Sequence, residues 1–119
     1  MTKTDLLVLR QDDNGICTLT LNRPKARNAL SLAMIDAILA ELESIAADDT
    51  ARVIVLAGAG AAFCAGHDLK ELKDNSDVST TQTLFDRCSD LMMRLIRMPQ
   101  PVIAKVHGVA TAAGCQLVA

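Results

Sequence analysis

Two stretches of small residues stand where backbone amides could bind an oxygen atom. Gly58 to Gly66 follows an apolar run and leads to His67, and Gly108 follows a second run and leads to Ala112–Cys115. Small side chains let a ligand approach the backbone, and the first amides of a helix point outward without an internal partner. Two such segments facing each other could hold one carbonyl oxygen. Small residues also permit close packing of the chain, so this pattern leaves both interpretations open.

Three other arrangements of reactive groups are weaker candidates. Gly58–Gly60 after an apolar run is similar to a dinucleotide-binding fingerprint, but the third glycine is missing. Cys64 and His67 could bind a metal, yet two ligands do not make a site, and we expect no metal. Cys115 and His107 could act as nucleophile and base, but the apolar neighbours of this cysteine favour a position in the core.

The elements that must position these segments begin with a hairpin and a helix. Leu6 to Arg10 and Ile16 to Leu21 are rich in Leu, Val, Ile and Thr, and Asp12–Gly15 between them favours a tight reversal. Ser31 can cap a helix whose apolar residues recur three or four apart as far as about Ala47. We therefore predict a β-hairpin followed by an amphipathic helix.

Further strands and helices alternate along the rest of the chain. Val53 to Ala57 is apolar on both faces, which predicts a strand buried on both sides and parallel to its neighbour. Ser79 to Gln82 has capping-box spacing and predicts a helix that ends at Met98. Val102 to Val106 predicts another strand, and Thr111 to Ala119 the start of another helix. This order is typical of α/β architecture with crossover connections.

Composition argues against several classes of protein. A net charge of −2 and the lack of Trp and Tyr provide no basic or aromatic surface for nucleic acid. No apolar run approaches the roughly 18 residues of a membrane span, and we recognise no signal or transit peptide. The four cysteines form no C-x-x-C pair, which favours reduced thiols. We expect a cytoplasmic protein with no nucleic-acid or membrane partner.

Three segments together resemble the signatures of a known family. Asn22–Leu30, Ala62–Leu72 and Val106–Leu117 are similar, in order and spacing, to the N-terminal signatures of the enoyl-CoA hydratase/isomerase (crotonase) family. The resemblance covers essentially the whole chain. It implies an α/β crotonase (ClpP-like) fold of repeated ββα units, with residues 1–119 as its N-terminal portion. It also implies acyl-CoA as substrate, coenzyme A only as part of that substrate, and a homotrimer or dimer of trimers.

The resemblance also assigns roles to single residues. It implies that the backbone N–H groups of His67 and Ala113 form an oxyanion hole for the thioester carbonyl. Such amides stabilise the negative charge that a carbonyl oxygen gathers as an enolate forms. Lys70 is expected to approach a phosphate of coenzyme A. The full set of residues implied at the coenzyme is Lys25, Ala26, Arg27, Ala65, Gly66, Asp68, Leu69 and Lys70.

Two residues of the third segment depart from the family pattern. Gln116 stands where hydratases of the family have a catalytic glutamate, and a neutral amide can orient water but cannot act as acid or base. Ala113 replaces a glycine and still donates its N–H if its φ is negative. We expect an enoyl-CoA hydratase/isomerase, a lyase that hydrates 2-enoyl-CoA. The alternative is an acyl-CoA-binding protein that has lost the chemistry.

Overall fold

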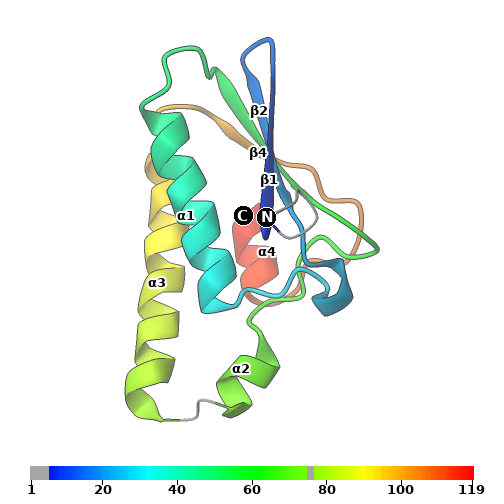
Figure 1. Ribbon diagram of the computed structural model, residues 1–119, viewed down its shortest axis with the longest axis vertical. Helices are drawn as coiled ribbons and strands as arrows, with labels where there is room; N and C mark the ends of the chain where they lie inside the picture. The colour runs from blue at the N-terminus through cyan, green and yellow to red at the C-terminus, as the bar shows by residue number, and fades with distance from the viewer. Residues whose placement is uncertain (1–5, 75–76) are drawn as a thin grey trace.

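A computed structural model describes residues 6–74 and 77–119 as a mixed sheet covered by helices (Figure 1). The strand order is β1-β2-β3-β4, with β1 antiparallel to β2 and the other two pairings parallel. This arrangement confirms the α/β class and the parallel placement of the third strand. The elements in chain order are β1 (Val8–Asp13), β2 (Ile16–Leu21), the 3₁₀ helix η2 (Pro24–Ala26), α1 (Leu32–Ala46), β3 (Val53–Gly58), α2 (Leu69–Asp74), α3 (Val78–Arg97), β4 (Val102–Ala104) and α4 (Ala113–Val118).

The predicted hairpin is present, but its turn is shorter than the sequence suggested. Asn14 and Gly15 alone connect β1 to β2, with φ of 52° and 85°. Two successive positive φ values match a two-residue turn whose twist fits the flanking strands. Asp12 and Asp13 therefore belong to β1, where Asp13 pairs with Ile16.

The two long helices begin at side-chain caps, of which one was predicted correctly. Ser31 caps α1, and its hydroxyl accepts a hydrogen bond from the amide of Met34 at 3.1 Å. The capping box predicted at Ser79 is wrong, because Asp77 caps α3 and accepts from the amide of Thr80 at 3.3 Å. A carboxylate at the earlier position satisfies the first free amides, so the helix begins sooner than the serine would allow.

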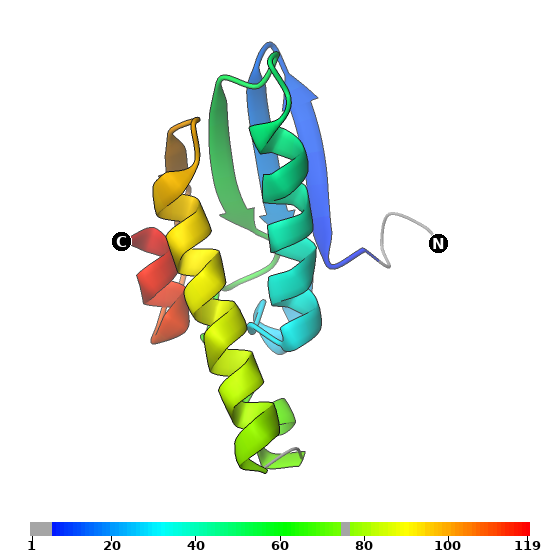
Figure 2. The same ribbon diagram turned by 90° about the vertical axis from the view of Figure 1, so that its left-hand side faces the viewer.

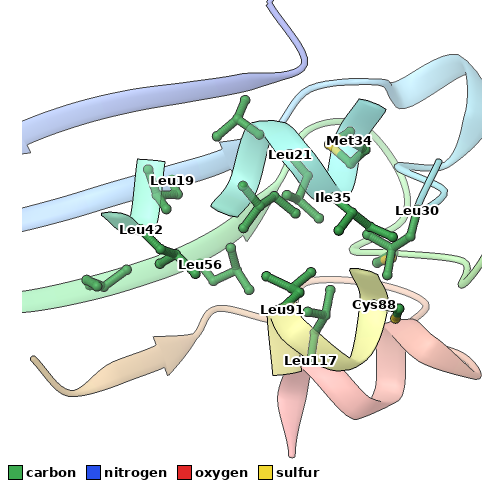
Figure 3. Packing of buried hydrophobic residues seen from close by; sticks show 14 of the residues in the cluster. Leu19, Leu21, Leu30, Met34, Ile35, Leu42, Leu56, Cys88, Leu91 and Leu117 are labelled. Carbon is green, nitrogen blue, oxygen red and sulfur yellow. The ribbon is translucent and has the colours of Figure 1, made fainter. Parts of the chain in front are cut away.

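The helices α1 and α3 lie side by side against the sheet (Figure 1), and Figure 2 shows α4 next to α3. The core fills the space between these layers. Figure 3 shows Leu91 of α3 beside Leu117 of α4, facing the side chains of the sheet. No helix within the described residues is long and apolar enough to cross a bilayer. Side chains with no exposed surface include Leu19, Leu21, Leu30, Met34, Ile35, Leu42 and Leu91.

Candidate functional site

Asn28 holds the loop that follows β3 in place. Its side-chain amide, fully buried, donates to the carbonyl oxygens of Ala59, Ala62 and Phe63 at 2.9, 3.0 and 3.1 Å. Its Oδ1 accepts a hydrogen bond from the amide of Arg23 at 2.8 Å. We missed this role in the sequence, because an asparagine before an apolar run carries no signal of partners more than thirty residues away.

The second small-residue segment packs directly on this loop. A Cβ added at Gly114 would lie 2.2 Å from the carbonyl oxygen of Cys64, and one at Gly108 would lie 2.2 Å from that of Ala61. The amide of Thr111 donates to the Cys64 oxygen at 3.1 Å. Close packing is therefore one function of these glycines, and it brings the two candidate segments together.

The amide of His67 lies beside this junction, and its direction is set by pairing with Leu30. Leu30 forms a parallel bridge with His67, through its amide to the Gly66 oxygen at 2.6 Å and its oxygen to the Asp68 amide at 3.2 Å. Alternate peptide groups of an extended chain point in opposite directions, so the N–H of His67 points away from Leu30. It donates to no acceptor among the described residues. The next helix, α2, starts two residues later at Leu69.

The amide of Ala113 is the other expected donor. Ala113 is the first residue of α4 and has negative φ, whereas its neighbour Ala112 has φ of 50° and ψ of −121°. No acceptor within residues 6–74 and 77–119 takes the Ala113 N–H. A Cβ at Gly66 would lie 3.2 Å from the Ala112 Cβ and 3.6 Å from the Ala113 nitrogen. The residue before His67 thus lies close to the peptide that carries the second amide.

A groove of about 680 Å³ opens beside this junction, between α3 and α4. His67 and Gln116 both line it, and the His67 ring meets the Phe85 ring edge-on with 4.9 Å between the centroids. Burial lowers the pKa of the His67 imidazole below its usual value. The other lining residues are mostly apolar, and they are Cys88, Ser89, Met92, Met93, Ile96 and Ala119.

The residues expected at the coenzyme lie on two neighbouring segments. The Ala65 amide donates to the Arg27 oxygen at 3.1 Å, which places Lys25–Arg27 beside Ala65 and Gly66. Leu69 and Lys70 are exposed at the start of α2. This surface offers backbone, an apolar side chain and cations to a ligand.

The carboxylate of Asp68 is already committed to the protein. It accepts from Arg23 at 2.7 Å and from the amide of Glu71 at 3.1 Å, which caps α2. The hydrogen bond from Arg23 holds the pKa of Asp68 below its usual value. The side chain of Asp68 therefore stabilises the loop, and its backbone is also engaged, through its amide to the Leu30 oxygen and its oxygen to the Leu72 amide.

Cys115 and His107 do not form a catalytic pair. Cys115 is exposed, so the prediction of a core position is wrong, because it lies on the face of α4 opposite Leu117 and the core. His107 donates from Nε2 to the carbonyl oxygen of Gly60 at 2.6 Å. Within the part of the chain that the structure describes, no three His, Cys, Asp or Glu side chains are grouped to bind a metal ion.

Both the sequence and the fold of this chain match those of known proteins. A family model described as Enoyl-CoA hydratase/isomerase matches residues 11–119. The chain is 43% identical to Enoyl-CoA hydratase domain-containing protein 3, mitochondrial, of Danio rerio, over 95% of this chain and 39% of that protein. It is 40% identical to 2,3-dehydroadipyl-CoA hydratase of Escherichia coli (strain K12), over 96% and 43%. The crystal structure of an enoyl-CoA hydratase of Mycobacterium smegmatis is 53% identical with a TM-score of 0.90, over 93% and 44%.

These relatives correct one prediction and limit others. The predicted cytoplasmic location is contradicted, because the similar Enoyl-CoA hydratase domain-containing protein 3 is named mitochondrial in five species. These species are Danio rerio, Mus musculus, Xenopus laevis, Rattus norvegicus and Homo sapiens. The physical reason is that free cysteines indicate a reducing environment without distinguishing one reducing compartment from another. The chain spans about two fifths of the length of the curated relatives it matches.

Proposed function

Because the chain belongs to the enoyl-CoA hydratase/isomerase family, we propose that it acts on acyl-CoA thioesters through two backbone amides, those of His67 and Ala113. The close approach of Gly66 to the Ala112–Ala113 peptide carries this proposal. Both amides are without an acceptor among the described residues, and unpaired donors at the edge of a groove are available to a ligand oxygen.

The two amides would act on the charge that develops during the reaction. When a nucleophile adds to an enoyl thioester, or a proton leaves its α-carbon, the carbonyl oxygen becomes an enolate oxygen. Fixed N–H dipoles stabilise that oxygen without reorganising, and one donor is worth about 10²- to 10³-fold in rate. Side chains at positions 67 and 113 do not affect this step, so Ala113 serves as well as glycine.

The surroundings of the amides suit the two ends of such a substrate. The groove along α3 presents Met92, Met93 and Ile96, whose apolar side chains fit an acyl chain. On the other side, Lys25–Arg27 and the exposed Lys70 offer cations for the coenzyme phosphates. The substrate would therefore cross the junction with its thioester carbonyl between the two segments. The trimer implied by the family resemblance stays a prediction, which sedimentation of the full-length protein would test.

Ala113→Pro tests the role of the second amide. Proline at the first residue of α4 removes no helix hydrogen bond, because that N–H has no partner within the helix. We expect turnover of crotonyl-CoA, followed by the absorbance of the conjugated thioester, to fall by about 10²- to 10³-fold in a folded variant. Unchanged turnover would show that this amide does not bind the reacting oxygen.

The alternative is an acyl-CoA-binding protein, and Gln116 favours it because an amide cannot transfer a proton. A thermal-shift titration with acetyl-CoA measures binding, and the crotonyl-CoA assay measures turnover. Stabilisation without turnover would identify the binder. Gln116→Glu is expected to raise hydration if only the carboxylate is missing, and no gain would mean that another group supplies the proton.

A further inference from the structure

The two histidines of the chain are used differently. His107 is hydrogen-bonded through Nε2 to the oxygen of Gly60, which ties the loop before the second segment to the loop after β3. Neither ring nitrogen of His67 has a hydrogen-bond partner among the described residues, and its Nδ1 is sealed from solvent. Buried polar atoms are nearly always paired in folded proteins, so an unpaired imidazole calls for an explanation.

The position of the His67 ring supplies that explanation. The ring lines the same groove as Gln116, and its edge-on contact with Phe85, at an interplanar angle of 83°, fixes its plane. Its own backbone amide is the proposed donor to the thioester oxygen. The imidazole and the amide proposed to bind the thioester oxygen therefore belong to the same residue at the wall of the groove.

The electrostatic surroundings keep this imidazole neutral. Cys88 of α3 is the other titratable group in the groove wall, and burial raises the pKa of its thiol, so it carries no charge. From α4 the groove receives Gln116, which is neutral, and the carboxylate of Asp68, the next residue in the chain, is paired with Arg23. Burial lowers the pKa of His67, so one ring nitrogen has a free lone pair at neutral pH.

We infer that the imidazole of His67 is the group that accepts and returns the proton, in place of the carboxylate that Gln116 lacks. The inference rests on the proposed function. In hydration, Gln116 holds a water molecule through its amide, and the water oxygen bonds to Cβ as its proton passes to the imidazole. The alkene electron pair moves to the thioester oxygen. The enolate then collapses and takes the same proton at Cα, which regenerates neutral imidazole and leaves H and OH added across the double bond.

His67→Gln and His67→Phe in the full-length protein separate this role from packing. Glutamine keeps the backbone amide and a polar side chain that does not titrate, and phenylalanine keeps an aromatic contact with Phe85. Both variants are expected to lose about 10²-fold or more in kcat on crotonyl-CoA, which is the usual contribution of general acid–base catalysis. Their stabilisation by acetyl-CoA should match that of the wild type, because the amide donors remain.

The pH dependence of kcat and a rescue experiment would be unaffected if His67 only packed against its neighbours. In the wild type, kcat should fall as the pH drops through the lowered pKa of His67, since protonation removes the lone pair. In His67→Gln, kcat should not show this fall at low pH. In His67→Ala, free imidazole added to the buffer should restore part of the lost turnover, whereas added pyrrole of similar shape should not.

Three results would count against these statements in different ways. If His67→Gln binds acetyl-CoA and turns over normally, the inference is overturned while the proposed function stands. If the wild type is stabilised by acetyl-CoA but hydrates no crotonyl-CoA, the imidazole has no such role and the chain is a binder. If the wild type neither binds nor reacts, the proposed function itself fails.

Discussion

A methyl group at position 114 is predicted to impair turnover by moving the amide beside it. The Cβ of Gly114→Ala would lie 2.2 Å from the oxygen and 2.8 Å from the carbonyl carbon of Cys64. Both atoms are backbone, next to the loop that Asn28 clamps, so the clash is relieved mainly by moving α4 and with it Ala113. A displacement of about 1 Å at a reacting group can cost about 10²-fold in rate. Overpacking of this kind also costs about 1–3 kcal/mol of folding free energy.

Gly108→Ala provides the matched control, because its Cβ would lie at the same 2.2 Å from a backbone oxygen, that of Ala61. Both variants should unfold at lower urea concentration than the wild type. Only Gly114→Ala should lose about 10²-fold in kcat/KM on crotonyl-CoA, measured where both proteins are folded. Wild-type turnover in folded Gly114→Ala, or an equal loss in Gly108→Ala, would refute the link between this contact and the Ala113 amide.

Three further substitutions have outcomes that follow from the contacts. Asn28→Asp sets a carboxylate oxygen against the three loop carbonyls that the amide now binds, so its free energy of unfolding in urea should fall by about 3 kcal/mol or more, and further than in Asn28→Ala. Ala112→Gly removes the cost of a positive φ and should raise the free energy of unfolding by about 1 kcal/mol, seen as a higher Tm. Asp68→Asn keeps a capping side chain and loses the ion pair with Arg23, which is 39% exposed, so at pH 7 we expect a loss of at most about 1 kcal/mol. The pKa of Asp68 is lowered in the folded protein, so its contribution is present above the unfolded pKa of about 4 and is lost as the pH falls from there through the lowered folded pKa. Below the folded pKa the two proteins should become equally stable.

The parts of the fold that the sequence predicted depend on neighbours close in the chain. The Asn14–Gly15 turn, the Ser31 cap and the apolar strand β3 each follow from a few adjacent residues. The start of α3 was misjudged by one such signal, because Asp77 is a competing cap two residues before Ser79. Local patterns therefore predict which elements exist better than where they begin.

The geometry of the site depends on contacts that no local pattern encodes. The direction of the His67 amide follows from the bridge with Leu30, and the position of the loop follows from Asn28. The positive φ of Ala112 has no sequence signal, because alanine rarely adopts it. The small-residue segments did predict close packing of the backbone, which Gly108 and Gly114 show against Ala61 and Cys64. They could not predict the direction of the His67 amide, since that depends on residues more than thirty positions apart.

A site built on backbone donors separates the binding of a substrate from the reaction it undergoes. The amides of His67 and Ala113 are the same whatever side chains stand there, so a change from glycine to alanine leaves the proposed carbonyl contact intact. Proton transfer, in contrast, depends on the side chains in the groove, where Gln116 has no titrating group and His67 has one. Membership of the family therefore supports the proposed contact between the two amides and a thioester carbonyl more strongly than it supports any particular reaction. The reaction is to be sought in the two side chains at positions 67 and 116.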